Sequence, residues 1–178
     1  TFAASSSAAS LSPSRGRWRI SWRCNVLIRR AALPDVLPLA RLLRELGWFA
    51  ALQNETCDET TVRVRHHLEL CLADDSHVVF VAESETGEVV GYTAVHWLPY
   101  LFLSGPEGFV SELFVSESVR GSGVGSQLLA AVVAAARERG CARLQLVNFR
   151  HRESYLRHFY EKQGWQERPE AADFVFFV

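Results

Sequence analysis

A glycine-rich stretch near the middle of the chain has the residue types and spacing of an anion-binding loop. Gly121, Gly123 and Gly125 occupy alternate positions in "ELFVSESVRGSGVGSQLL", between an apolar run and an alanine-rich segment. If these flanks are a strand and a helix, the loop lies where unpaired N–H groups carry the positive end of the helix dipole. The spacing therefore predicts a phosphate-binding loop, although a turn that only joins strand to helix would use the same glycines.

Two common nucleotide-binding loops do not fit this stretch. A P-loop ends in Gly-Lys followed by Ser or Thr, whereas Gly125 is followed directly by Ser126. A dinucleotide-binding loop needs a further glycine at position 126 and an acidic residue about 20 positions later, where "ARLQLV" offers none. The loop is therefore expected to bind a phosphate group in another context.

Two residues outside the loop could transfer protons. Glu112 is a carboxylate in an otherwise apolar strand pattern, and Tyr160 lies in "HFYEKQGW" further along the chain. A positioned carboxylate can act as a general base and a tyrosine hydroxyl as a general acid. Either residue could equally be structural, Glu112 as a solvent-facing strand residue and Tyr160 as a core aromatic.

The hydrophobic periodicity predicts the elements that must position these residues. Helical patterns cover residues 35–47, 59–74, 124–140 and 154–164, and strand patterns cover 25–31, 77–84, 89–98, 109–115, 142–147 and part of 165–178. The strand at 142–147 should run parallel to 109–115, because a helix connects them. The sequence thus predicts an α/β (α+β) fold with a mixed, mostly antiparallel sheet of about six to seven strands and helices on both faces.

Composition limits the number of domains and the compartment. The chain has 178 residues, of which 48% are apolar, which predicts a single domain over residues 25–178. Residues 1–24 are rich in Ser, Ala and Arg and lack acidic residues, which is typical of a disordered or targeting-like extension. We therefore expect a cytoplasmic protein, or one in an organelle stroma or matrix if this extension is a transit peptide.

Composition also bears on partners. A formal net charge of -1 gives no basic field that would attract nucleic acid or a membrane surface. No apolar run reaches the roughly 18 to 20 residues of a membrane helix. The four cysteines show no metal-ligand or disulfide spacing, so no metal is expected.

The pattern Arg120-x-x-Gly123-x-Gly125 after "ELFV", together with "FYEKQGW", resembles the GNAT superfamily of acetyl-CoA-dependent N-acetyltransferases. The resemblance extends from about Val26 to the C-terminus and implies the GNAT fold with acetyl-CoA as cosubstrate. It implies that successive loop amides bind the pyrophosphate of CoA. It also implies that the pantetheine arm of CoA lies between two splayed parallel strands and pairs with the backbone of the first strand. The implied cofactor-binding residues are Leu113, Phe114, Val115, Arg120, Gly121, Ser122, Gly123, Val124, Gly125 and Ser126.

The resemblance also implies catalytic roles. Tyr160 matches the family tyrosine that protonates the departing thiolate, and Glu112 matches a position where many relatives carry a glutamate base that often acts through water. The reaction implied is direct acetyl transfer, in a ternary complex, to the primary amine of a small molecule or peptide. An acyl-CoA-binding regulatory module without turnover is an open alternative, and a homodimer is common in the family.

This chain departs from the family pattern at one position. Many relatives have a cofactor-contacting asparagine seven positions before the tyrosine, where this chain has Glu153, and Asn148 is out of register with it.

For the acceptor amine, an apolar pocket is expected from aromatic residues in the first half of the chain and in the 98–108 loop, with glutamates to attract an ammonium group. The candidates are Trp48, Phe49, Trp97, Tyr100 and Phe102, with Glu45, Glu55 and Glu59.

Overall fold

A five-stranded mixed sheet organises the part of the chain that the computed structural model describes, residues 25–176. The strands lie in chain order, and every neighbouring pair is antiparallel except the last, which is parallel. They are β1 (Val26–Arg30), β2 (His77–Ser84), β3 (Val89–Leu98), β4 (Glu107–Val115) and β5 (Arg143–Leu146). The parallel β4–β5 pair follows from the helix that joins these strands, as the sequence predicts.

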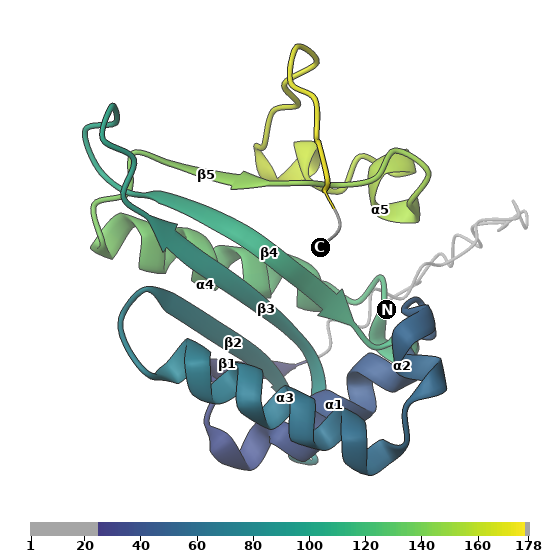
Figure 1. Ribbon diagram of the computed structural model, residues 1–178. Coiled ribbons are helices and arrows are strands. Elements are labelled where there is room, and N and C mark those ends of the chain that lie inside the picture. The colour runs from purple at the N-terminus through teal and green to yellow at the C-terminus, as the bar shows by residue number, and fades with distance from the viewer. Residues whose placement is uncertain (1–24, 177–178) are drawn as a thin grey trace, which may run out of the picture.

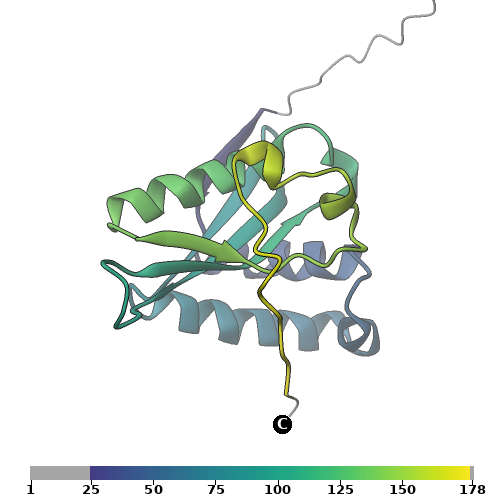
Figure 2. The same cartoon turned by 90° about the horizontal axis from the view of Figure 1, so that it is seen from above.

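Helices cover both faces of the sheet, so the molecule has three layers (Figure 1). Helices α1 (Val36–Glu45) and α3 (Cys57–Leu72) pack on one face, and α4 (Val124–Glu138) packs on the other. A short helix, α2 (Ala50–Asn54), joins α1 to α3. Figure 2 shows α4 and α3 on opposite sides of the sheet.

Local sequence signals explain where the two long helices begin and end. Thr56 and Glu59 form a reciprocal capping box at the start of α3, with the Glu59 amide donating to the Thr56 Oγ over 3.2 Å. Helix α4 begins after Gly123, and Gly140, with φ of +69°, follows its end. The glycine loop is therefore held between β4 and the N-terminus of α4, as predicted.

The hydrophobic core on each face of the sheet reflects the alternation along the strands. Val79, Val81 and Tyr92 face α1 and α3, whereas Val78, Val95 and Val110 face α4. Alternate side chains of a strand point to opposite faces, so these strands are apolar on both sides. The mixed, mostly antiparallel sheet with helices on both faces is thereby confirmed.

The predicted number of strands is wrong, because residues 173–176 form no strand. After Gly164 the chain makes a turn in which the Ala171 amide donates to the Arg168 carbonyl over 3.1 Å. The following segment leaves the body beyond the layer of α1 and α3 (Figure 2), and Phe174 and Phe176 are 90% and 89% exposed. A strand needs a partner edge for its backbone groups, and this segment has none within residues 25–176, so its β-branched and aromatic residues produce no pairing.

The predicted helix over residues 154–164 is also interrupted. Only α5 (Glu153–Leu156) and a short 3-10 turn, η3 (Glu161–Gln163), form there. His158 has φ of +54°, the Phe159 amide donates to the Ser154 carbonyl over 2.9 Å, and the His158 amide donates to Tyr155 over 2.8 Å. This is the hydrogen-bond pattern of a Schellman C-cap, here with a non-glycine residue in the left-handed region. The break redirects the chain just before Tyr160.

Residues 1–24, for which the sequence predicts a disordered or targeting-like extension, lie outside the described residues. Among the helices that the structure describes, none has the length and apolar character needed to cross a membrane.

Candidate active site

The β4–β5 pair separates into a wedge at a bulge in β4. Pairing between the two strands ends at Val110 and Leu146, although β4 continues to Val115. The register of β4 against β3 shifts at the same point, because Ala94 faces Glu112 while Val95 faces Val110. Ser111 is therefore the extra residue of a β-bulge. Beyond it, the edge of β4 that faces away from β3 has no strand partner within residues 25–176.

The glycine loop presents free amides at the start of α4. Gly121 and Gly123 have φ of +80° and +96°, a conformation that side-chain-bearing residues rarely adopt. A glycine is needed at position 125 for a different reason, because a Cβ there would lie 3.2 Å from the Phe159 Cζ. The Arg120 and Ser122 amides donate to the Glu117 and Val119 carbonyls. Within residues 25–176, five other amides of this loop donate to no backbone carbonyl, namely those of Gly121, Gly123, Val124, Gly125 and Ser126.

A cavity of ≈ 760 Å³ joins this loop to the wedge. It brings together all the sequence-predicted cofactor-binding residues except Ser122, and both predicted catalytic residues also line it. Segments far apart in the chain contribute: Trp48 and Phe49, the end of β4, the glycine loop, and residues 146–160. Five unpaired amides at a helix N-terminus are suited to an anion, and the unpaired strand edge is suited to an extended chain with amide groups.

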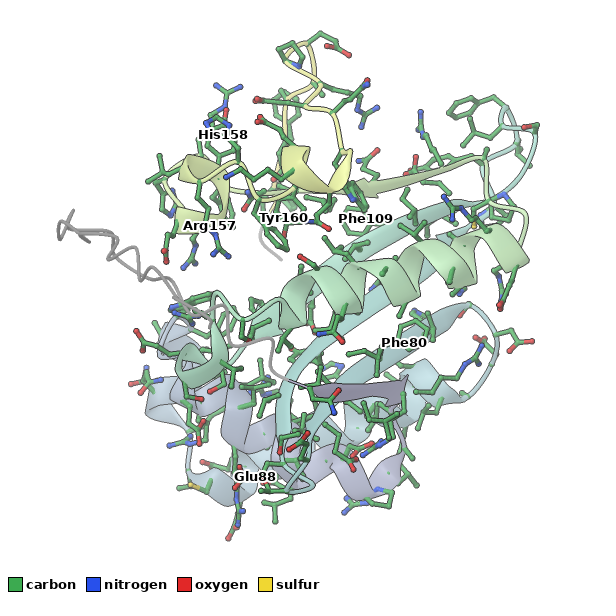
Figure 3. All side chains as sticks on the ribbon, turned by 180° about the vertical axis from the view of Figure 1, so that it is seen from behind. Phe80, Glu88, Phe109, Arg157, His158 and Tyr160 are labelled. Atoms are coloured by element: carbon green, nitrogen blue, oxygen red, sulfur yellow. The ribbon has the colours of Figure 1, made fainter. Side chains whose placement is uncertain are left out.

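Tyr160 lies at the boundary of this cavity. Its ring makes edge contacts with Phe159 and Trp165 at centroid distances of 5.0 and 6.2 Å, and Phe159 in turn packs against Gly125. Burial raises the pKa of Tyr160, and the nearby Arg157 charge offsets part of the increase. Figure 3 shows Tyr160 between the α5–η3 segment and α4. Burial thus shifts the titration of this hydroxyl further from neutral pH, where a tyrosine is in any case protonated.

Glu112 lines the same cavity from β4, and its side chain is exposed. It lies opposite Ala94, on the face that α1 and α3 cover. Its neighbour Tyr92 is 4% exposed, and the pKa of Tyr92 is raised well above its usual range by burial and, further, by the Glu112 carboxylate. Cys71 also lies near Glu112, and its pKa is raised by burial and by that charge. Glu112 is thus a carboxylate that solvent can reach, beside a buried neutral hydroxyl.

Trp48 closes one side of the cavity and packs against two arginines: Arg120, which the family resemblance implies as a cofactor-binding residue, and Arg152, which the sequence assigned to no site. The Arg120 and Arg152 guanidinium carbons lie 5.0 and 4.5 Å from the Trp48 ring centroid. The same ring makes an edge contact with Phe114. Arg152 and Arg157 also line the cavity, which gives it cationic groups beside the free amides. Arg152 lies in the basic run Arg150, His151 and Arg152, which by itself could equally be a solvated surface loop.

Several other predicted pocket residues lie elsewhere. Trp97 is buried against α4 with Arg139 over its ring, and Tyr100 and Phe102 are exposed in the β3–β4 loop. Glu55 pairs with Arg63, and Glu59 belongs to the α3 capping box. These residues have structural or surface positions, so only Trp48 and Phe49 of the predicted aromatic set reach the cavity.

No group of three or more His, Cys, Asp or Glu residues that could hold a metal ion occurs within residues 25–176.

Comparison with known proteins yields one consistent family. Residues 41–165 match the family model described as the acetyltransferase (GNAT) family. The chain is 42% identical over 77 residues to aminoglycoside N(6')-acetyltransferase type 1 of Stenotrophomonas maltophilia, a match that covers 41% of this chain and 50% of that protein. This chain thus spans about half the length of that curated relative.

A second relative is matched over more of its length. Thialysine N-epsilon-acetyltransferase of Bos taurus is 30% identical over 129 residues, covering 68% of this chain and 73% of that protein. Among solved structures, a transcriptional regulator from Bacillus halodurans C-125 superposes with a TM-score of 0.73 at 26% identity, covering 85% of this chain and 100% of that one.

Proposed function

Because the chain belongs to the GNAT family of acetyltransferases, we propose that it transfers an acetyl group from acetyl-CoA to a primary amine by direct attack in a ternary complex. The observation that carries this proposal is the cavity that joins five free loop amides, the unpaired β4 edge, Glu112 and Tyr160. Members of the family use acetyl-CoA in general. The residues present fit that cosubstrate, as each part of the cavity indicates.

The glycine loop is suited to the pyrophosphate. Amides that have no partner at a helix N-terminus stabilise negative charge, and the positive φ of Gly121 and Gly123 turns the backbone toward the cavity without side chains in the way. Arg120 and Arg152 add positive charge at the same end. The unpaired edge formed by Leu113, Phe114 and Val115 would pair with the amide groups of the pantetheine arm.

Two proton transfers accompany the reaction, and the site has one group for each. Acetyl-CoA supplies an acyl carbon activated as a thioester. As the amine nitrogen forms its bond to that carbon and the carbon–sulfur bond breaks, the nitrogen loses a proton and the sulfur gains one. Glu112 accepts the first proton, directly or through water, and the Tyr160 hydroxyl donates the second. A tyrosine hydroxyl is protonated near neutral pH, and burial raises the pKa of Tyr160 further, so the group enters the reaction with a proton to donate.

The acceptor side of the cavity suits a cationic amine. Phe49, which packs edge-on against Phe114, provides aromatic surface, and Glu112 provides a negative charge in the same cavity. Aromatic faces and carboxylates both attract ammonium groups. The two curated relatives are named for aminoglycoside and thialysine substrates, which supports a small-molecule amine as the acceptor class.

Thiol release from acetyl-CoA, measured across a panel of amines, tests this function. The panel would contain an aminoglycoside, thialysine, lysine and a polyamine. We expect release with at least one amine class, and we expect Tyr160→Phe to reduce kcat by about 100-fold or more with little change in the Kd of acetyl-CoA. Tyr100→Phe is the matched control, because Tyr100 lies in the β3–β4 loop outside the cavity.

Two results would contradict the proposed mechanism. Unchanged kcat in Tyr160→Phe would remove the tyrosine from the chemistry. Tight acetyl-CoA binding without thiol release for any amine would instead favour the alternative function, an acyl-CoA-binding regulatory module.

A further inference from the structure

Ser111 and His96 form a hydrogen-bonded pair at the bulge of β4. The Ser111 Oγ lies 2.8 Å from the His96 Nε2, and a longer contact of 3.4 Å joins the same hydroxyl to the Ala94 carbonyl. The shorter distance is that of a full hydrogen bond, whereas the longer one is beyond the usual range for a hydroxyl donor. The imidazole is therefore the principal partner of this hydroxyl.

The bulge explains why this hydroxyl reaches the cavity. Ser111 is the extra residue of β4 and has no pairing partner on β3. A bulge redirects the side chain of its extra residue, and such bulges are common beside active sites. Ser111 is exposed and lines the 760 Å³ cavity next to Glu112. The hydroxyl thus faces the cavity, and His96 lies behind it on β3.

His96 is half-buried beside a second histidine. Its ring makes an edge contact with the His77 ring of β2 at a centroid distance of 4.6 Å, and it lies 6.4 Å from the Phe109 ring of β4. Burial lowers the pKa of His96, and the charge of His77 lowers it further. The imidazole is therefore neutral near neutral pH. In the tautomer with its proton on Nδ1, its Nε2 accepts from the Ser111 hydroxyl.

Other titratable groups lie on both sides of this pair. Toward the surface, the His77 Nδ1 lies 4.0 Å from a carboxylate oxygen of Asp74, which is exposed. Toward the cavity, Glu112 is exposed on β4, and its charge raises the pKa of Cys71 on α3. A proton taken up by His96 thus has a carboxylate on the cavity side and exposed groups on the other side, through which it can pass to solvent.

A cationic acceptor has to lose two protons, and Glu112 accounts for one of them. An amine such as that of lysine has a pKa of about 10.4, so it is an ammonium at neutral pH. An ammonium nitrogen has no lone pair with which to attack a thioester. One proton therefore leaves before the attack, and a second leaves as the nitrogen–carbon bond forms. The first proton needs an acceptor of its own.

We propose that His96 accepts this first proton through the Ser111 hydroxyl. The ammonium donates a proton to the Ser111 Oγ as that hydroxyl passes its own proton to the His96 Nε2, which leaves a neutral amine, an intact serine and an imidazolium. The imidazolium releases its proton to solvent before the next turnover. Glu112 and Tyr160 act in the bond-forming and bond-breaking step that follows. This inference rests on the proposed function, because it assumes that an ammonium substrate enters the cavity.

The pH profile of kcat/KM tests this relay. His96→Gln removes the basic nitrogen and keeps a polar partner for Ser111, and Ser111→Ala removes the hydroxyl. His67→Gln is the matched control, because His67 is an exposed histidine of α3 that does not line the cavity. Thiol release from acetyl-CoA is measured from about pH 6 to pH 10 with the amine of the panel that has the highest turnover. The Kd of acetyl-CoA and the Tm are measured for each protein.

We expect the profiles to differ in shape. In the wild type, kcat/KM should be level above the ordinary histidine pKa of about 6.5 and should fall below the lowered pKa of His96, where the imidazolium accepts no proton. Both variants should lose about 100-fold at pH 7, the contribution of a positioned acid–base group. The loss should shrink about tenfold for each pH unit above 7, because the solution then supplies neutral amine. The Kd of acetyl-CoA and the profile of His67→Gln should match the wild type.

Two outcomes would overturn the proposal. Wild-type kcat/KM at pH 7 in either variant would show that the proton leaves by another route. A loss of the same size at every pH, with a lowered Tm, would show that the pair only supports the structure. Absence of thiol release by the wild-type protein with every amine would overturn the proposed function as well, so the two failures are distinguishable.

Discussion

The conformation of the glycine loop leads to a prediction that separates backbone strain from ligand binding. Gly123 has φ of +96°, and a Cβ at this position would meet no atom within 4 Å. Gly123→Ala therefore introduces no collision and acts only through the backbone. Holding an L-residue in the left-handed region costs about 1 to 2 kcal/mol. In a domain of this size, that corresponds to a fall in Tm of roughly 2 to 8 °C.

The chain contains a matched control for the same strain. Gly87, in the β2–β3 turn, has φ of +82°, and a Cβ there would also meet no atom within 4 Å. Gly87→Ala should cost a similar free energy of unfolding, but this turn contributes no residue to the cavity. The pair of variants thus differs in position relative to the glycine loop and not in the kind of perturbation.

Acetyl-CoA affinity should distinguish the two variants. Relaxation of the strain at Gly123 would redirect the amides of Gly123 and Val124, and a hydrogen bond to a charged group contributes about 1.5 to 3 kcal/mol. Loss of one such bond weakens binding by about 10- to 100-fold. We expect this loss for Gly123→Ala and wild-type affinity for Gly87→Ala, measured by calorimetric titration beside thermal unfolding. If both variants lost the same stability and bound acetyl-CoA as the wild type does, the assignment of the loop to the pyrophosphate would be refuted.

Three further predictions concern single side chains. Glu112→Gln should lower kcat about 100-fold without changing the Kd of acetyl-CoA, and unchanged kcat in stopped-flow thiol assays would argue against a base at this position. The pKa of Tyr92 is raised in the folded state. The stability that this shift contributes is complete below about pH 10, the pKa in the unfolded state, and is lost as the pH rises toward the pKa in the folded state. Urea unfolding of wild type and Tyr92→Phe should therefore show a stability difference that shrinks above about pH 10; a constant difference would contradict this. Thr56→Ala should cost about 1 kcal/mol through loss of the α3 cap, and a Tm within error of the wild type would exclude that role.

Much of the fold could be predicted from local patterns because the signals were local. The apolar alternation of β2 and β3 and the turn at Gly87 specify a hairpin without reference to the rest of the chain. The glycine loop was predicted because its spacing and its position between strand and helix are sequence properties. The placement of Tyr160 beside this loop followed from the family resemblance and not from periodicity.

The features that sequence reasoning missed depend on contacts between distant segments. The left-handed conformation of His158 interrupts a helical pattern that looked continuous, and the residue type alone does not predict it. The stacking of Arg120 and Arg152 on Trp48 joins three loops. The apolar residues at 174–176 have the composition of a strand, but pairing depends on an edge that the local sequence does not encode.

The central claim is that the glycine loop and the β4–β5 wedge bind acetyl-CoA for transfer to an amine. The most direct measurement is calorimetric titration of acetyl-CoA into the wild-type protein and into Gly123→Glu, which places a carboxylate where the pyrophosphate belongs, followed by thiol release with the amine panel. The account predicts saturable one-site binding to the wild type, no binding to the folded variant, and thiol release with at least one amine. Equal binding to both proteins, or no binding to the wild type, would contradict it.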